Sequence, residues 1–278
     1  MKLIFDTVSL STSKMVTRAY STSFSLGINC LSQKFHHAIY SIYGFVRCAD
    51  EIVDSFQDYD KELLLTEFRE ETLKAIDRKI SLNPVLNSFQ AVVHQYHIEM
   101  ELIECFLNSM EMDLHKNAHN HASYNQYILG SAEVVGLMCL RVFTEGNKEF
   151  YETLKPAAMK LGAAFQKVNF LRDLQADFKI LGRVYFPTVD MSQFSEAEKI
   201  AIEVEIQQDF DDALIGIKQL PVSSRFGVYV AYVYYKALFA KIKALPSARI
   251  MQERVRINNY QKASLLAGSF LKHRLGIL

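Results

Sequence analysis

Residues 166–177 place two aspartates on an otherwise apolar helix. At about 100° per residue, Gln166, Asn169, Asp173 and Asp177 fall within an arc of roughly 80°. A helix that is apolar on most of its circumference is usually buried in a bundle, so this stripe is expected to face an internal cavity. Two carboxylates one helical turn apart repel each other, and more strongly once water is removed. A cation is therefore expected between them.

A second acidic stripe lies in residues 43–54. The same arithmetic brings Tyr43, Arg47, Asp50 and Asp54 within roughly 60° on another apolar helix. Two facing pairs of aspartates can hold hard divalent cations, which take oxygen ligands. Mg²⁺ in particular usually keeps several waters and bridges to substrate phosphates.

Arginines accompany both stripes. Arg47 and Arg172 carry a fixed charge and a planar pair of donors that suits phosphate oxygens. The competing interpretation is two solvated acidic faces with ordinary Arg–Asp pairs. One Asp-x-x-x-Asp pair alone would favour that interpretation. Two pairs, each flanked by apolar residues and accompanied by Arg, Asn and Gln, favour a site for metal and phosphate.

The rest of the chain has the periodicity of consecutive helices, with no alternating strand pattern and no internal repeat. The five prolines are expected near helix boundaries, where helices tolerate them. No composition shift marks a linker, so residues 1–278 are predicted to form a single all-α domain. The expected helices are 34–55, 61–78 with Asp60 as N-cap, 85–113, 124–143, 195–219 and 226–243.

Charge and composition exclude several classes of protein. Thirty-one Lys and Arg balance thirty-one Asp and Glu, so no long-range field suggests nucleic acid or an anionic membrane as a partner. No apolar run approaches the ~18 residues of a spanning helix, the longest candidate being 227–235. The cysteines form no Cys-x-x-Cys and no secretory signal is evident. A cytoplasmic protein is expected, at most peripheral at the inner face of the membrane.

The two stripes resemble the aspartate-rich motifs of the phytoene/squalene synthase family, the head-to-head prenyl transferases. The resemblance runs from Tyr20 to Ile257 and is most specific in Gln166-x-x-Asn169-x-x-Arg172-Asp173-x-x-x-Asp177. It implies an isoprenoid-synthase-type helical bundle around a central cavity. It also implies Mg²⁺, with Mn²⁺ as a substitute, and two prenyl diphosphate substrates, geranylgeranyl or farnesyl diphosphate. The implied metal ligands are Asp50, Asp54, Asn169, Asp173 and Asp177.

The resemblance assigns roles to further residues. The serine matching Ser21 contacts diphosphate and the aromatic matching Phe24 lines the prenyl pocket, although a Ser/Thr cluster is most often a turn or a helix cap. Tyr127 matches a tyrosine at the centre of the active site, with Tyr124 close enough to leave the choice open. The loop 179–187 looks like a lid beside the diphosphate. The full substrate-binding set is Ser21, Phe24, Tyr43, Arg47, Gln166, Asn169, Arg172, Arg183, Tyr235 and Arg254.

Other features depart from the family or suggest alternatives. Glu133 stands where the family usually has glycine, in a segment whose small residues allow either close helix packing or room for a lipid chain. Gln175 and Ala176 replace a common Gly-Glu. The histidines between 115 and 121 match no established zinc spacing, and their polar neighbours suggest an exposed loop.

The product is inferred from the first motif. Asp50-Glu-Ile-Val-Asp54 resembles phytoene synthases, and no Gly-x-Gly nucleotide fingerprint occurs, although squalene synthases lack one too. Phytoene from two geranylgeranyl diphosphates, formed without NADPH, is therefore expected. The alternatives are squalene or dehydrosqualene from farnesyl diphosphate and a non-catalytic assembly factor of the same fold. A di-metal carboxylate bundle would need Glu-x-x-His pairs, which the sequence lacks.

Overall fold

The computed structural model describes residues 2–115, 118–179, 182–187, 189 and 194–275, apart from the side chains of Asp177 and Lys179. Within these ranges the chain is helical, and the only pairing outside helices is an isolated bridge between Ala118 and Val184. The prediction of an all-α fold is confirmed, whereas the single domain stays a prediction. The helices are α1 (Lys2–Tyr20), α2 (Thr22–Asn29), α3 (Gln33–Ser55), α4 (Lys61–Arg78), α5 (Pro84–Tyr96), α6 (Met100–His115), α7 (His121–Ile128), the π-helical turn η1 (Leu129–Glu133), α8 (Val134–Thr144), α9 (Lys148–Lys179), α10 (Glu196–Gln219), α11 (Val222–Lys243), α12 (Ser247–Ile250) and α13 (Asn259–Arg274).

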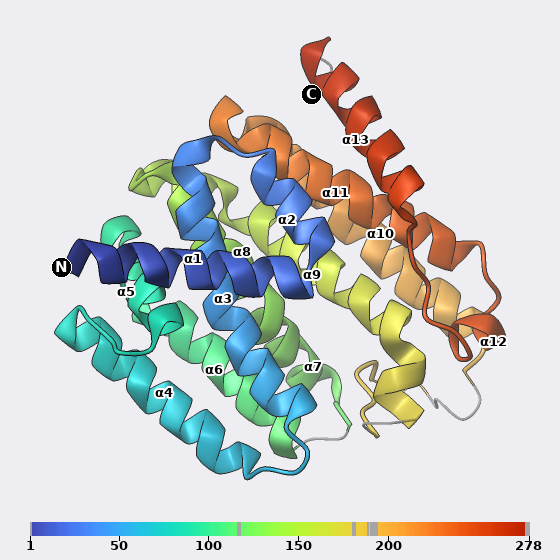
Figure 1. Cartoon of the computed structure of the whole chain (residues 1–278). Helices are drawn as coiled ribbons and strands as arrows, with labels where there is room; N and C mark the ends of the chain where they lie inside the picture. The colour runs from blue at the N-terminus through green and yellow to red at the C-terminus, as the bar shows by residue number, and fades with distance from the viewer. Residues whose placement is uncertain (1, 116–117, 180–181, 188, 190–193, 276–278) are drawn as a thin grey trace.

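The helices pack into a bundle (Figure 1). Two apolar clusters of side chains hold it together. The first joins α3, α5, α6 and α8, and at its centre the rings of Phe45 and Phe89 stack with centroids 4.0 Å apart. The second joins α7, α9, α10 and α11 around the fully buried Phe210. Helix α3 belongs to the first cluster, whereas α9 begins in the first cluster with Tyr151 and Leu154 and carries its acidic stripe on the half that belongs to the second.

Local capping explains several helix starts. The Asp60 carboxylate accepts the Leu63 N–H at 3.0 Å, as expected from the sequence. Ser195 and Glu198 form a reciprocal capping box at the start of α10. Ser21 caps α2 by accepting the Phe24 N–H at 3.2 Å, so the helix-cap interpretation of this serine is confirmed.

Two expectations about helix boundaries were wrong. The segment 85–113 is two helices, because His97 adopts a left-handed backbone (φ 53°) and its N–H closes α5 on the Val93 carbonyl. Pro156 lies inside α9 rather than at a boundary. A proline inside a helix costs about 3 kcal/mol or more. Packing of α9 against its neighbours therefore has to offset this cost, and the sequence alone does not show that packing.

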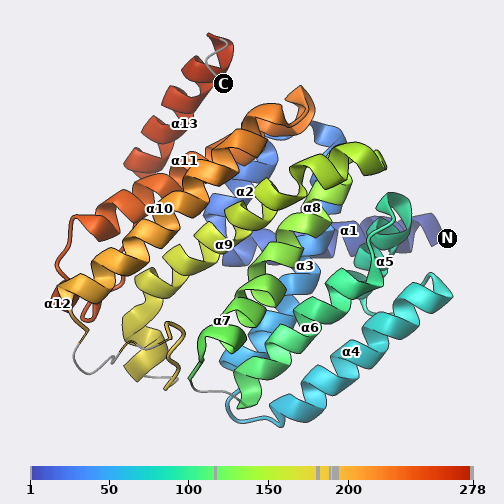
Figure 2. The same cartoon turned by 180° about the vertical axis from the view of Figure 1, so that it is seen from behind.

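One helical stretch, His121–Thr144, is long and apolar enough to cross a membrane by length and composition, with mean hydropathy 1.4. The expectation that no run approaches this length was therefore wrong. In the structure 61% of its apolar window is buried inside the bundle, and a core helix meets the same two criteria. The stretch forms α7, η1 and α8 beside α6 and α9 (Figure 2).

The sequence left open whether the small residues of this stretch allow close helix packing or leave room for a lipid chain. In the structure some allow close packing and others line the cavity. A Cβ on Gly130 would lie 2.6 Å from the Cys105 carbonyl oxygen and 2.7 Å from the Ser109 Cβ, so glycine permits the close approach of α6. Ser131, Ala132 and Gly136 instead line the central cavity.

Gly130→Ala is expected to lower the free energy of unfolding by about 1–3 kcal/mol, because the added methyl meets backbone that cannot move aside. The matched control is Gly268→Ala on α13, where an added Cβ meets nothing within 4 Å. That change is expected to leave stability unchanged or to raise it by about 0.5–1 kcal/mol. Urea denaturation of the two variants measures the difference, and equal stabilities would contradict the close-approach argument.

Candidate functional site

A cavity of about 890 Å³ lies between the two apolar clusters. Both acidic stripes lie on its wall, so the prediction that they face an internal cavity is confirmed for the side chains that the structure describes. Asp177 belongs to α9, but its side chain lies outside the described part. The stripe residues on the wall are Tyr43, Arg47, Asp50 and Asp54 from α3, and Gln166, Asn169 and Asp173 from α9.

The cavity has a polar end and an apolar remainder. Four carboxylates lie at the polar end together with Arg47, Arg172, Arg183 and Arg254. Away from it the wall is apolar and includes Ile39, Cys139, Phe143, Leu154, Ile217 and Leu220. Because Ile39 and Asp54 both line the cavity and both belong to α3, the wall follows that helix for about 22 Å at 1.5 Å per residue.

On α3 the guanidinium of Arg47 forks between two carboxylates. One terminal nitrogen donates to Asp50 and the other to Glu51, and the Tyr20 ring lies 4.3 Å from the guanidinium carbon. Burial and the nearby Asp54 carboxylate together raise the pKa of Asp50 to about 7, against the opposing effect of Arg47. The polar end thus favours additional positive charge beside Asp50.

On α9 the Asp173 carboxylate is bound by two arginines. Nε of Arg172 donates to its Oδ1 at 3.0 Å, and Nε of Arg254 lies 2.7 Å from the same oxygen. Arg254 comes from the segment after α12, far away in sequence. The structure therefore places this arginine at the polar end, as the resemblance implied.

Arg183 reaches the α3 stripe from the segment 182–187. It is 7% exposed, and it donates to the Asp54 Oδ1 at 2.8 Å and to the backbone carbonyls of Val53 and Asp113 at 3.3 Å each. Arg183 is therefore a buried residue of the polar end and not an ordinary surface arginine. Nearby carboxylates, Asp113 foremost, raise the pKa of Arg183 in spite of its burial.

Sequence reasoning missed a buried polar group at this end. Asp113 is 8% exposed, accepts the Tyr127 hydroxyl at 2.7 Å and lies 3.9 Å from Arg183. Burial raises its pKa to about 7, against the opposing effect of Arg183. Asp113 stands at the end of a predicted helix and the start of an apparent loop, which hid it. The only signal was the Asp-Leu pair at 113–114.

The expected exposed loop after Asp113 is partly wrong, because His119 is buried. Its ring lies against Tyr127 and Tyr185, at centroid distances of 5.2 and 5.7 Å. His115 and His121 are exposed. Across the described residues no group of three or more His, Cys, Asp or Glu side chains is placed to hold a metal ion, the histidines included.

The structure distinguishes between the two candidate tyrosines. Tyr127 lines the cavity, whereas Tyr124 is buried with Phe186 on the side of α10. Burial and the neighbouring carboxylates of Glu205 and Asp209 raise the pKa of Tyr124. Tyr127 is therefore the tyrosine of the pair that could contact a ligand in the cavity.

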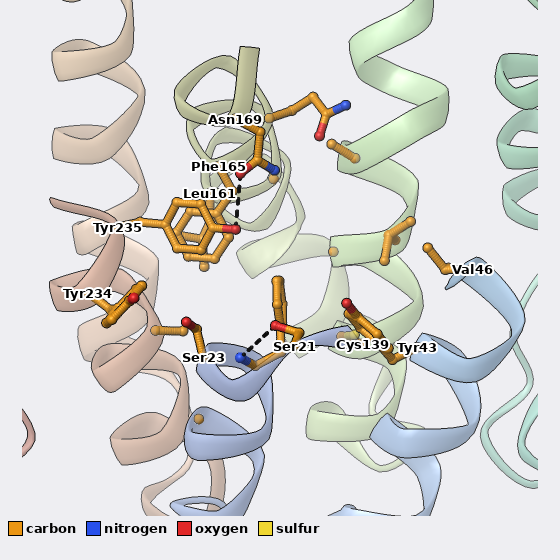
Figure 3. Close-up of a pocket in the computed structure, with 18 of the residues that line it drawn as sticks. Ser21, Ser23, Tyr43, Val46, Cys139, Leu161, Phe165, Asn169, Tyr234 and Tyr235 are labelled. Atoms are coloured by element: carbon orange, nitrogen blue, oxygen red, sulfur yellow. Dashed lines mark hydrogen bonds between the residues drawn. The ribbon is translucent and has the colours of Figure 1, made fainter. Parts of the chain in front are cut away.

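Aromatic rings form the wall next to the polar end (Figure 3). The Tyr235 hydroxyl donates to the Asn169 Oδ1 at 3.3 Å, and its ring stacks on Phe165 at 3.9 Å. Phe24 packs between Tyr43 and Tyr235, with centroids 5.3 and 6.3 Å away. Burial raises the pKa of Tyr43 to about 12, so this phenol stays neutral at physiological pH.

Glu133, the departure from the family pattern, is not among the described side chains that line the cavity. It lies toward Lys160 and Lys167 on α9, and burial raises its pKa against their opposing charges. Lys167 in turn pairs with the buried Asp209 of α10 at 2.5 Å. The extra carboxylate thus belongs to the charged contact between α9 and α10.

Comparison with known proteins adds to this geometry. A family model described as squalene/phytoene synthase matches residues 17–261. The chain belongs to this family. Squalene/phytoene synthase family members are prenyl transferases, and the polar end described above is made entirely of residues inside the matched range.

Family relatives are distant in sequence. The chain is 25% identical over 249 residues to phytoene synthase 1, chloroplastic, of Solanum lycopersicum, covering 82% of this chain and 60% of that protein. It is 24% identical over 257 residues to the phytoene synthase of Arthrospira platensis, covering 83% and 82%. A solved dehydrosqualene synthase in complex with ligand shares the fold at a TM-score of 0.80 and 19% identity, covering 97% and 98%.

The carboxylate and amide oxygens of this family member suit a hard divalent cation. Asp50 and Asp54 on α3 and Asp173 and the Asn169 side-chain oxygen on α9 line the same cavity. Burial and the neighbouring Asp54 carboxylate raise the pKa of Asp50, so a cation beside it would favour its charged form. The described carboxylates form no ready-made three-carboxylate cage. Such a donor set fits Mg²⁺, which keeps waters and takes phosphate oxygens to complete its coordination.

Arg47→Lys is expected to lower kcat/KM about tenfold or more, because a lysine cannot bridge Asp50 and Glu51 while also offering two parallel donors to a phosphate. Steady-state kinetics with prenyl diphosphate measures the loss. Arg78→Lys, on the exposed end of α4, is the matched control. Unchanged kinetics for Arg47→Lys would mean that Arg47 only forms ion pairs with carboxylates on α3 and does not bind phosphate.

Proposed function

We propose that the chain is a Mg²⁺-dependent head-to-head prenyl transferase that condenses two geranylgeranyl diphosphates to phytoene. The supporting observation is a cavity that follows α3 for about 22 Å, with aspartates and arginines gathered at one end and a mainly apolar wall beyond them. A diphosphate fits the first part and a prenyl chain the second. The non-catalytic alternative is disfavoured because Asp50, Asp54 and Asp173 all remain at the cavity wall.

The polar end supplies binding and charge. Asp50, Asp54, Asn169, Asp173 and Asp177 would hold the metal, which when bound neutralises the diphosphate leaving group as a Lewis acid. Arg47, Arg172, Arg183 and Arg254 are the donors available for phosphate oxygens. Each of them is held by an aspartate in the structure, so the arginines are already oriented before substrate enters.

The apolar part of the cavity keeps water away from the carbocation that forms during the reaction. Loss of diphosphate from one substrate leaves an allylic cation, which adds to the alkene of the second substrate to give a tertiary cation. Loss of a proton to a base such as the released diphosphate then closes the cyclopropane ring of a cyclopropyl diphosphate. Phe24, Tyr43 and Tyr235 present rings beside the polar end, where they exclude water and offer π faces to positive charge. A second ionisation and rearrangement then yield the hydrocarbon.

The final step separates phytoene from squalene. Loss of a proton leaves the central double bond of phytoene and needs only a basic acceptor, such as the departed diphosphate. Squalene requires a hydride from NADPH, and dehydrosqualene arises from C15 units without it. The form of the first motif supports the C20 substrate, while the shared fold with a dehydrosqualene synthase keeps C15 as the alternative.

Asp50→Asn and Asp173→Asn are each expected to lower kcat about a hundredfold or more, in the range of losing one transition-state-stabilising group. The substitution keeps the size of the side chain, so circular dichroism should show the helical content of the parent. Asp77→Asn, exposed on α4, is the control. Turnover near the parent rate in either variant, or full activity in EDTA, would contradict the metal assignment.

Purified protein with C20 diphosphate and Mg²⁺ is expected to give phytoene, and added NADPH is expected to change neither rate nor product. Mass spectrometry of the extracted hydrocarbon identifies the product. Parallel incubations with C15 diphosphate complete the comparison. A requirement for NADPH, or a strong preference for C15 substrate, would overturn the phytoene assignment and leave the prenyl transferase assignment intact.

A further inference from the structure

Helix α1 packs against the body of the protein through small polar side chains. It crosses over α3 at the front of the view in Figure 1. The buried residues of α1 are Ser9, Ser13 and Thr17. The Ser13 hydroxyl lies 2.7 Å from that of Ser88 on α5, and a Cβ on Gly44 of α3 would come within 2.9 Å of it. These small side chains therefore let α1 lie close against α3 and α5.

The outward face of α1 is apolar, which is the reverse of an ordinary surface helix. Ile4, Val8 and Met15 are 70%, 50% and 65% exposed. At about 100° per residue they share an arc of roughly 80° with the exposed Ser11 and Ala19, on the side opposite the buried residues. These five residues form the outward arc of α1, and none of them is charged. A surface helix ordinarily turns its apolar side inward and its polar side to solvent.

Helix α4 shows the ordinary arrangement in the same protein. It buries Leu65, Thr72 and Ala75, and its exposed residues are mostly charged. A peripheral helix of this bundle therefore does not need an apolar outer face in order to pack. The family match begins at residue 17, near the end of α1, so family membership does not account for most of the outward arc either.

The turn before α5 extends this apolar surface at one end. Leu82 in this turn is 91% exposed. Its neighbour Ser81 donates its backbone N–H to the Asn87 Oδ1 at 3.3 Å, and the Asn87 amide donates to the Asp6 Oδ1 of α1 at 3.1 Å. The turn is thereby held beside the first turns of α1, where Leu3 is 77% exposed. Neighbouring exposed apolar side chains of this kind mark an interaction surface.

The order of residues along the outward arc is symmetric about its middle. Reflection about the peptide bond after Ser11 exchanges Val8 with Met15. The same reflection exchanges Ile4 with Ala19. A two-fold interface places one surface against itself, so two antiparallel copies of a helix need this kind of order. Each aliphatic side chain then meets an apolar residue of the other copy, and the small Ser11 at the crossing lets the helices approach closely.

We propose that the outward arc of α1 is the interface at which two copies of the chain form a symmetric dimer, with their α1 helices antiparallel. The helix pair is about 28 Å long, and the turn at Leu82 adds to the contact. Such an interface lies at the low end for specific complexes, below about 1,200 Å² in total, so a dimer is expected at micromolar rather than nanomolar concentrations. The residues of the outward arc are not among those that line the cavity, so the proposal stands independently of the proposed reaction.

Sedimentation velocity at a series of protein concentrations tests self-association. The full chain is expected to shift from monomer to dimer across the micromolar range. Val8→Glu with Met15→Glu is expected to raise the dissociation constant tenfold or more, because it brings like charges together in the contact. The matched pair Ile200→Glu with Val204→Glu, also exposed aliphatic side chains but on α10, is expected to leave it unchanged. Circular dichroism checks that each variant is folded. A wild-type monomer throughout the series, or a dimer that the α1 variant leaves intact, overturns the proposal.

Cysteine cross-linking tests the symmetry of the dimer. Ser11→Cys places a thiol at the crossing, so a disulfide-linked dimer is expected on oxidation, above the background set by the parent chain. Ile4→Cys is the matched control, because antiparallel packing separates the two copies of residue 4 by about 22 Å, which is too far for a disulfide. Cross-linking of both variants, or of neither, overturns the antiparallel dimer. So does a monomeric parent that binds phosphatidylcholine vesicles and loses this binding in Val8→Glu with Met15→Glu, since lipid would then cover the outward arc.

Discussion

Neutralisation of carboxylates by arginine determines the shape of the polar end of the cavity. Asp50, Asp54 and Asp173 line the same cavity, and each is bound by a guanidinium. Two of these guanidiniums, from Arg183 and Arg254, arrive from segments far from their partners in sequence. Removing one partner would leave an uncompensated charge, which is strongly unfavourable when buried. The ion pairs therefore hold the later segments of the chain against the two central helices.

The apolar part of the cavity depends on a different constraint. The cores on either side are closely packed, with stacked rings such as Phe45 on Phe89 and contacts such as Gly130 against α6 that admit no further atom. Packing within each core, together with the Lys167–Asp209 pair behind α9, fixes both walls without filling the space between them. An elongated apolar cavity can persist only if its walls are held from behind in this way.

The helical period predicted much of this arrangement, because spacing determines which side chains share a helix face. Two acidic stripes on apolar helices were enough to place Asp50 and Asp173 at one cavity. The break at His97 was not predictable, since neither glycine nor proline marks it and only tertiary packing stabilises its left-handed backbone. Asp113 was missed for a related reason. A carboxylate beside histidine and lysine looks solvated until the partners Tyr127 and Arg183, distant in sequence, are seen around it.

The π-helical turn η1 separates two parts of one continuous helical stretch. In it the Val134 N–H bonds to the Leu129 carbonyl, five residues back, so the turn accommodates one residue more than an α-helical turn does. This extra residue sets the rotation between α7, which presents Tyr127 to the polar end, and α8, which presents Gly136 and Cys139 to the apolar part. Loss of one residue here would restore a regular helix and rotate one half by about 100° relative to the other. For this part of the chain, length is therefore more tightly constrained than the identity of most side chains.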